Sequence, residues 1–150
     1  MKPSTPHHTI GKYMQTLRQE VAEMSDAEAR EYLLLVDEAR TNEYHEQHRA
    51  FRSMLRRTTD TRIGISKTAT LIILWNARNK LVSKDHLADN LEFLANIDAK
   101  SPYAATTDIK MIRKFIKQMG WPIEIITDYG MGHMLMAPKE FILPGLEKTT

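Results

Sequence analysis

The chain of 150 residues contains no cysteine. This absence excludes a disulfide framework and any metal site built from thiolates. Long apolar runs are missing as well: the longest spans residues 71–75, whereas a membrane-spanning helix needs roughly 20 apolar residues. The first ten residues lack the apolar core of a signal peptide. We therefore expect a soluble, cytoplasmic protein.

Residue groups that would indicate catalysis or a cofactor are also lacking. His45 and His48 are one helical turn apart, but no third metal ligand lies near them in the sequence. Gly130 and Gly132 do not form a nucleotide-binding fingerprint, because a third glycine and a following helix are absent. No nucleophile–base pair stands out. We expect no metal, no cofactor and no enzymatic activity.

What the chain has is the composition of a globular protein, with 42% hydrophobic and 27% charged residues. The net charge of +2 hides an asymmetry. Residues 20–48 contain nine acidic residues and two arginines, whereas residues 49–120 contain fourteen basic and six acidic residues. The basic part would attract a polyanion, for which nucleic acid is the commonest candidate. A solvated basic face is the alternative.

The first 60 residues predict helices and little else. We expect residues 1–9 to be a disordered tail and residues 10–24 to form a short amphipathic helix. Ser25 and Glu28 form a capping box, which predicts a helix to about residue 57. Apolar residues recur on it at three- and four-residue steps: Tyr32, Leu33, Val36, Ala39, Tyr44, His48, Phe51 and Leu55. This stripe needs a partner. We expect residues 10–60 to be a dimerisation or docking region.

The remaining sequence predicts three helices and a β-hairpin, with the boundary in residues 58–64. Ser66 is the expected N-cap of a helix over residues 67–78, and residues 79–80 form a turn. Residues 81–82 are extended before Ser83 caps a second helix to about residue 94. After a loop at 96–103, Thr106 or Thr107 caps a third helix to residue 119. Strands at 123–127 and 133–137 flank the turn sequence YGMG. The expected domain spans residues 61–138, with a C-terminal tail at 139–150.

The third helix is amphipathic, with a basic outer face. Ile109, Ile112, Ile116 and Met119 share one side, and the other faces carry four cations: Lys110, Arg113, Lys114 and Lys117. An α-helix fits the DNA major groove, where Arg and Lys can contact guanine and phosphate. Most lysine-rich helix faces are simply solvated, so this feature alone favours that alternative.

Four stretches in order give a more specific indication. They are ISKTATLIILW, LVSKDHLADNLE, TTDIKMIRKFIKQMG and IITDYGMGHML, within residues 65–135. Together they resemble the DNA-binding domain of OmpR-type (PhoB-like) response regulators, which is a winged helix-turn-helix. The resemblance covers about half of the chain. It implies a mainly α fold with a small β-hairpin, in which the third helix enters the major groove and the hairpin is the wing.

The resemblance implies a set of DNA contacts and partners. The candidate contacts are Thr106, Thr107, Lys110, Met111, Arg113, Lys114, Lys117, Tyr129, Met131, His133, Ser83, Lys84 and Lys67. The implied function is a sequence-specific transcriptional regulator of double-stranded DNA, associated with the nucleoid. Its partners would be a second copy of the chain, through the N-terminal helices, and RNA polymerase.

The chain also departs from this family. The receiver domain and its phospho-acceptor aspartate are absent, so we do not expect regulation by phosphorelay. Asp128 and Tyr129 stand where the family's wing usually has a basic residue, and His133 replaces a tyrosine. These differences leave the contacts of the wing open. The alternative function is a protein-interaction module, in which a winged helix docks a polymerase or host protein without DNA.

Overall fold

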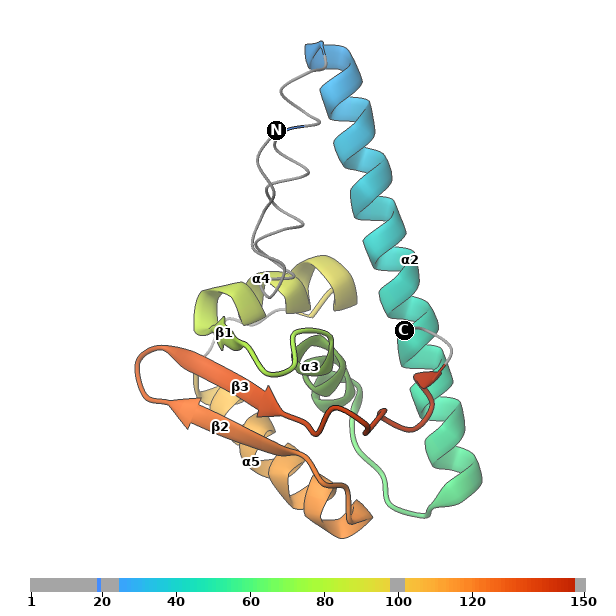
Figure 1. Cartoon of the computed structure of the whole chain (residues 1–150), viewed down its shortest axis with the longest axis vertical. Helices are drawn as coiled ribbons and strands as arrows, with labels where there is room; N and C mark the ends of the chain where they lie inside the picture. The colour runs from blue at the N-terminus through green and yellow to red at the C-terminus, as the bar shows by residue number, and fades with distance from the viewer. Residues whose placement is uncertain (1–18, 20–24, 98–101, 148–150) are drawn as a thin grey trace. The chain divides into compact units, whose positions relative to one another are not determined.

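The computed structural model describes residue 19, residues 25–97 and residues 102–147, and of residues 102–107 the backbone only. The chain divides into two compact units, Met1–Arg40 and Thr41–Thr150. The described elements are α2 (Asp26–Thr58), α3 (Ile65–Asn76), β1 (Leu81–Ser83), α4 (Lys84–Ala95), α5 (Pro102–Met119), β2 (Glu124–Asp128) and β3 (Gly132–Met136) (Figure 1). The described part is mainly helical with one small antiparallel sheet. The tail expected at 1–9 and the helix expected at 10–24 lie outside the described residues, apart from residue 19.

Two predicted helix starts are confirmed. At the start of α2, the Ser25 amide donates to Glu28 Oε1 over 3.1 Å and the Glu28 amide donates to Ser25 Oγ over 3.2 Å. These reciprocal bonds form the capping box and lower the pKa of Glu28. At the start of α4, Ser83 Oγ accepts from the His86 amide over 3.1 Å. Both caps satisfy amides that a helix leaves without intrahelical partners.

Two other predicted starts are wrong. The helix expected at 67–78 is α3, which begins two residues earlier, with Gly64 as N-cap and no side-chain cap. The Ser66 hydroxyl instead donates to Asp108 Oδ2 on α5 over 2.8 Å. The third helix does not begin at Thr106 or Thr107, because the backbone is helical from Pro102 onward. The loop after α4 is correspondingly shorter than expected. Ser66 therefore forms a tertiary hydrogen bond in place of a cap, and the two threonines lie inside a helix that starts before them.

The domain boundary expected at residue 60 also differs from the structural one. The second unit begins at Thr41, so the second half of α2 belongs to it. Tyr44, Phe51 and Leu55 from the expected stripe are buried there, and Gln47 exchanges two 2.9 Å hydrogen bonds with Asn76 of α3. This half of the stripe therefore packs within the chain and needs no external partner. In the first unit, by contrast, Leu33, Leu34 and Leu35 are exposed.

Helix α3 is the centre of the second unit. All eight residues from Thr68 to Trp75 are buried, and α4, α5 and β3 pack around them (Figure 1). A helix that is covered on every side must be apolar all round, which explains the short apolar run in the sequence. The buried hydroxyls of Thr68 and Thr70 donate to the carbonyl oxygens of Gly64 and Ser66, four residues earlier, so no polar group is left unsatisfied at these positions.

The sheet has the strand order β1-β3-β2, with both pairs antiparallel. Its inner face buries Val82, Ile125 and Leu135 against the helices. The hairpin prediction is confirmed: β2 and β3 pair from Glu124↔Met136 to Asp128↔Gly132 around a turn at Gly130, whose φ is +85°. The extended segment expected at 81–82 is the third strand of the same sheet.

The expected C-terminal tail is largely part of the core. Leu143 and Leu146 are completely buried, and the ring of Phe141 meets the ring of Trp75 edge-on at 6.0 Å between centroids. Gly145 passes so close to α2 that an added Cβ would lie 3.1 Å from Phe51 Cα. Residues 139–147 thus fill the space beside the second half of α2. The prediction failed because this segment lies outside any helix or strand, apart from a short turn of helix at residue 147, and so has no periodic pattern.

Candidate nucleic-acid interface

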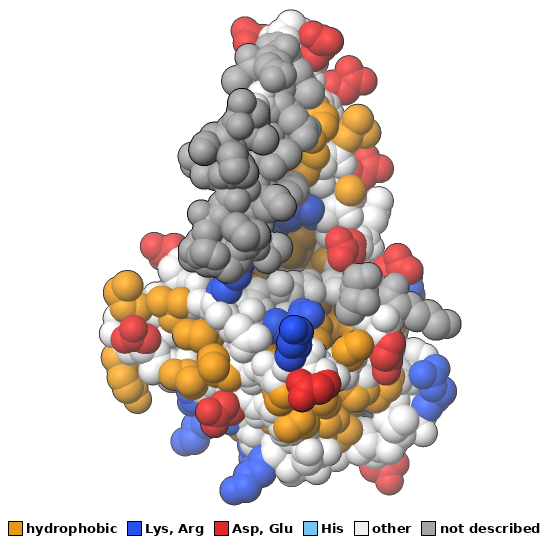
Figure 2. All heavy atoms as spheres, viewed as in Figure 1, with side chains coloured by type: hydrophobic (Ala, Val, Ile, Leu, Met, Phe, Trp, Pro, Cys, Tyr) orange, Lys and Arg blue, Asp and Glu red, His pale blue; other side chains and the backbone are white. Residues whose placement is uncertain are grey.

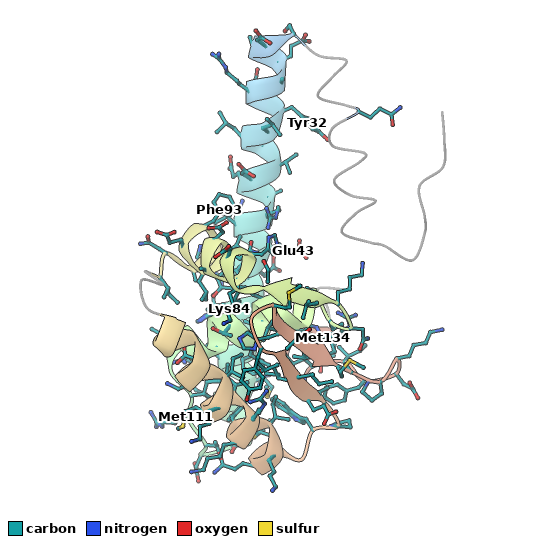
Figure 3. All side chains as sticks on the ribbon, turned by 90° about the vertical axis from the view of Figure 1, so that its left-hand side faces the viewer. Tyr32, Glu43, Lys84, Phe93, Met111 and Met134 are labelled. Atoms are coloured by element: carbon teal, nitrogen blue, oxygen red, sulfur yellow. The ribbon has the colours of Figure 1, made fainter. Side chains whose placement is uncertain are left out.

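Helix α5 carries a cationic face, which we define as Lys110, Arg113, Lys114 and Lys117. All four side chains are exposed, whereas Ile109, Ile112, Phe115 and Ile116 on the opposite side are buried. No acidic residue occurs between positions 109 and 119. At 100° per residue the four cations fall within one arc of about 100°. Met111 is also exposed and lies on the outer side of the helix in Figure 3. The arrangement gives one strongly positive surface on a firmly packed helix.

The buried side of α5 is anchored to α3 near its N-terminal end. Asp108 accepts a 2.8 Å hydrogen bond from Ser66 Oγ, and Lys67 Nζ lies 3.8 Å from Asp108 Oδ1. The ion pair is partly exposed and therefore contributes little by itself. Its consequence for the interface is that Lys67, an expected DNA contact, already has an anionic partner in the chain. This pairing could not be predicted from the sequence, because the two residues are 41 positions apart.

Arg113 connects α5 to the hairpin. Its Nε donates to the carbonyl oxygen of Ile125 over 2.9 Å, and its Nη2 donates to Thr127 Oγ1 over 2.7 Å. Both acceptors are on β2, so the guanidinium fixes the hairpin against the cationic face. Arg113 was expected to contact DNA only. It remains exposed and charged, but part of its hydrogen-bonding capacity serves this link between helix and strand.

The link continues from Thr127 to His133 on β3. Thr127 Oγ1 lies 2.9 Å from His133 Nδ1, and because Thr127 already accepts from Arg113, its own proton is free for His133. Burial, followed by the positive charges of Arg113 and Lys84, lowers the pKa of His133. His133 is only 4% exposed. The expectation that His133 contacts DNA is therefore corrected: the side chain faces the interior and supports the hairpin.

The hairpin tip offers apolar and aromatic groups to solvent. Tyr129 is 92% exposed and Met131 is 57% exposed. The turn is closed by a 2.9 Å hydrogen bond from the Met131 amide to the Asp128 carbonyl oxygen. No lysine or arginine occurs between residues 118 and 138. The tip therefore cannot supply a cation to a phosphate or to a narrow minor groove.

The remaining expected contacts lie at the start of α4 and within α5. Ser83 is exposed, but its hydroxyl oxygen is used to cap α4, and Lys84 next to it is exposed (Figure 3). Thr106 and Thr107 lie within α5, and their side chains are outside the described part of the structure. The cationic face, Met111, Lys84 and the hairpin tip are thus the expected residues that the structure places at the surface.

A second group of exposed arginines lies outside α5. Arg49, Arg56 and Arg57 at the end of α2 are exposed, and so is Arg62 in the loop that follows. Arg52 differs from these arginines because it is half-buried and its Nη1 donates to the carbonyl oxygen of Ile63 over 2.8 Å. Arg52 therefore holds the loop between α2 and α3.

Further features of the described residues bear on other classes of function. Within residues 25–97 and 102–147, no three His, Cys, Asp or Glu side chains gather in a way that would bind a metal ion. None of the described helices is both long and apolar enough to cross a lipid bilayer. Among known proteins, no family model matches the chain and no curated protein matches it. The candidate interface therefore rests on its own geometry.

Proposed function

We propose that the second unit is a winged helix-turn-helix domain that binds double-stranded DNA with sequence preference and acts in transcriptional regulation. The observation that carries this proposal is the cationic face of α5, on which four exposed cations and no acid oppose a fully buried side. Lysine and arginine on an exposed helix neutralise phosphates and bond base edges in the major groove.

The arrangement around α5 is consistent with this function. The order helix, strand, helix, helix, strand, strand and the sheet order β1-β3-β2 agree with the order expected of a winged helix. In such a domain α5 would lie in the major groove and the hairpin would lie beside it, near the backbone. Arg113 supports that geometry, since it fixes β2 against α5. The tip would contribute Tyr129 and Met131 as packing groups.

The direct test is DNA binding by the full chain. Fluorescence anisotropy with labelled genomic fragments at several salt concentrations would give the affinity and its salt dependence. We expect binding at low salt, a steep loss as salt rises, and clear differences between fragments at moderate salt. A chain that binds no fragment at low salt, or that binds all fragments equally at moderate salt, does not have this function.

Dimerisation belongs to the same proposal and rests on the first unit. Leu33, Leu34 and Leu35 of α2 are exposed, with Leu34 at 68%. We propose that residues 26–40 contribute to a homodimer, which would favour DNA sites with two related half-sites. Light scattering coupled to size exclusion should give a dimer mass for the native chain and a monomer mass for Leu34→Asp. If the native chain and Leu34→Asp have the same mass, this region is not the dimer contact.

A protein-interaction module without DNA readout is the second candidate. The acidic first part of α2 and the exposed apolar groups of the sheet favour it. Charge reversal at Lys110, Arg113 and Lys114 separates the two functions. Loss of DNA binding with retained protein binding supports the DNA function, and the opposite result supports the interaction module.

A further inference from the structure

The outer face of the sheet, turned away from the helices, is apolar. Strand register places Leu81 beside Met134 and Met134 beside Ile126, so these three side chains form one row across β1, β3 and β2. Met136 lies in the next row. Leu81, Ile126 and Met136 are exposed, and Met134 is half-buried. Hydrophobic side chains gather over the hairpin in Figure 2. Contiguous apolar surface of this kind marks interaction sites more often than chance.

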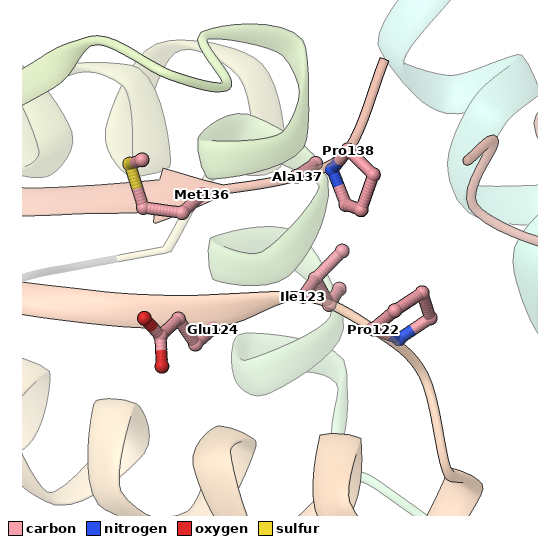
Figure 4. Close-up of a pocket in the computed structure, with 6 residues that line it drawn as sticks. All are labelled: Pro122, Ile123, Glu124, Met136, Ala137 and Pro138. Atoms are coloured by element: carbon pink, nitrogen blue, oxygen red, sulfur yellow. The ribbon is translucent and has the colours of Figure 1, made fainter. Parts of the chain in front are cut away.

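This row leads into a groove at the base of the hairpin. The groove has a volume of about 510 Å3 and is lined by Pro122, Ile123, Glu124, Met136, Ala137 and Pro138. Figure 4 shows residues 122–124 on one side of the groove and residues 136–138 on the other. Since Met136 belongs both to the groove and to the apolar row, the two features form one continuous surface. Flexible methionine side chains on such a surface adapt well to an inserted side chain.

Glu124 is the only charged residue that lines the groove. Among the described residues it has no ion-pair partner. Its Cα lies in register with that of Met136, so the groove has a carboxylate residue on one strand and an apolar residue opposite it on the other. Lys139 and Glu140, which follow Pro138, are exposed and cancel in charge. The groove therefore combines apolar contact with one negative charge.

We propose that this outer face docks a segment of another protein, which inserts an apolar side chain into the groove and places a Lys or Arg beside Glu124. DNA does not fit, because Glu124 and Asp128 on the same side of β2 would repel phosphates. A second copy seated symmetrically does not fit either, because it would bring two Glu124 side chains into one interface. An apolar segment with an adjacent cation complements both properties of the surface.

This inference concerns a different face from the one that would bind DNA, so the two proposals fail separately. The experiment is selection of displayed random peptides on the immobilised full chain, followed by affinity measurement of the enriched peptides. We expect enriched peptides to share an apolar residue close to a Lys or Arg. Their affinity should fall at least tenfold for Glu124→Lys and, independently, for Met136→Asp.

Matched controls distinguish the groove from general surface effects. Glu92→Lys makes the same charge change on α4, and Ile65→Asp makes a similar change at an exposed apolar residue at the start of α3. Both should bind the peptides like the native chain. With methyl-labelled methionine, the NMR signals of Met134 and Met136 should shift on peptide addition, whereas that of Met111 on α5 should not.

Several outcomes would overturn the proposal. These are the absence of any enriched peptide, enriched peptides without a basic residue, and equal binding by Glu124→Lys and the native chain. Self-association that Met136→Asp abolishes would assign the face to a second copy instead. A tenfold loss of DNA affinity in Met136→Asp would assign it to DNA.

Discussion

The cationic face of α5 and the outer face of the sheet are both exposed surfaces of the second unit, but they differ in kind. The first carries four cations above a buried apolar side, and the second carries apolar rows beside the carboxylates of Glu124 and Asp128. Binding through the first should depend strongly on salt, since it exchanges counterions for phosphates. Binding through the second should depend mainly on buried apolar area. The two proposals together predict that one small unit binds two partner classes without competition between them.

The largest expected effect comes from removing the charge of the first face. Lys110→Glu together with Lys114→Glu should lower DNA affinity on the order of a hundredfold or more at moderate salt, because two favourable phosphate contacts become repulsive. Peptide binding by the outer face of the sheet should not change. Anisotropy titrations would measure both affinities. Lys139→Glu, at an exposed lysine outside α5, makes half of this charge change and should cost little DNA affinity.

A glycine substitution tests whether the sheet holds both surfaces in place. An added Cβ at Gly132 would overlap the Val82 carbonyl oxygen and lie 2.8 Å from Ser83 Cα, so Gly132→Ala must push β1 and β3 apart. We expect the free energy of unfolding to fall by about 1–3 kcal/mol, as for other overpacked sites. Urea titration would measure it. Gly64→Ala meets no atom within 4 Å and should cost less, since it only replaces an N-cap glycine by the less favourable alanine; equal losses in the two variants would contradict this account.

Arg113 connects the two surfaces, because it lies on the cationic face and its guanidinium binds β2. Arg113→Lys keeps the charge but loses the planar fork that serves Ile125 and Thr127. We expect a stability loss of about 1 kcal/mol, as for a hydrogen bond that is lost without a buried charge. Thr127→Val should cause a loss of similar size. If Arg113→Lys lowers DNA affinity without any change in stability, the link to the hairpin is unimportant.

A smaller effect should appear in the pH dependence of stability. Burial and nearby cations lower the pKa of His133 below its ordinary 6.5, and burial with Arg52 and His45 lowers that of His48. As the pH falls, these histidines are protonated in the unfolded chain before they are protonated in the folded chain. The free energy of unfolding therefore decreases as the pH falls below about 6.5. His133→Asn keeps an acceptor for Thr127 and cannot titrate. Thermal melts from about pH 7.5 to about pH 5.5 should show a smaller decrease for this variant.

A decrease of the same size in the native chain and in His133→Asn would show that His133 does not titrate in this range. The hydrogen bond between Thr127 and His133 makes this test specific, because protonation of Nδ1 would remove the acceptor that Thr127 uses. It would also place a charge beside Arg113.

Some parts of the fold could be predicted from the sequence because their signals are local. The caps at Ser25 and Ser83 and the inward side of α4, with Leu87, Leu91 and Leu94, depend on residues within a few positions of one another. The turn at Gly130 is of the same kind. Such features can be predicted because the interactions that form them join residues that are close in the sequence.

Other parts could not be predicted because distant contacts decide them. Ser66 has the pattern of an N-cap, but its hydroxyl binds Asp108 across 42 positions. Leu143 and Leu146 have no periodicity, yet they are completely buried. The same applies to the interface: the cationic face follows from helical spacing, whereas the attachment of Arg113 to β2 and the burial of His133 follow from tertiary packing. The boundary at Thr41 lies inside one continuous helix, where no sequence signal marks it.

The salt dependence of DNA binding decides whether the cationic face of α5 binds DNA. For four phosphate contacts the plot of log affinity against log salt should have a slope of about −3.6, and Lys114→Gln should reduce its magnitude by about 0.9. Among genomic fragments, some should retain binding at moderate salt and others should not. A slope near zero, a slope that Lys114→Gln leaves unchanged, or equal affinity for every fragment would contradict the claim.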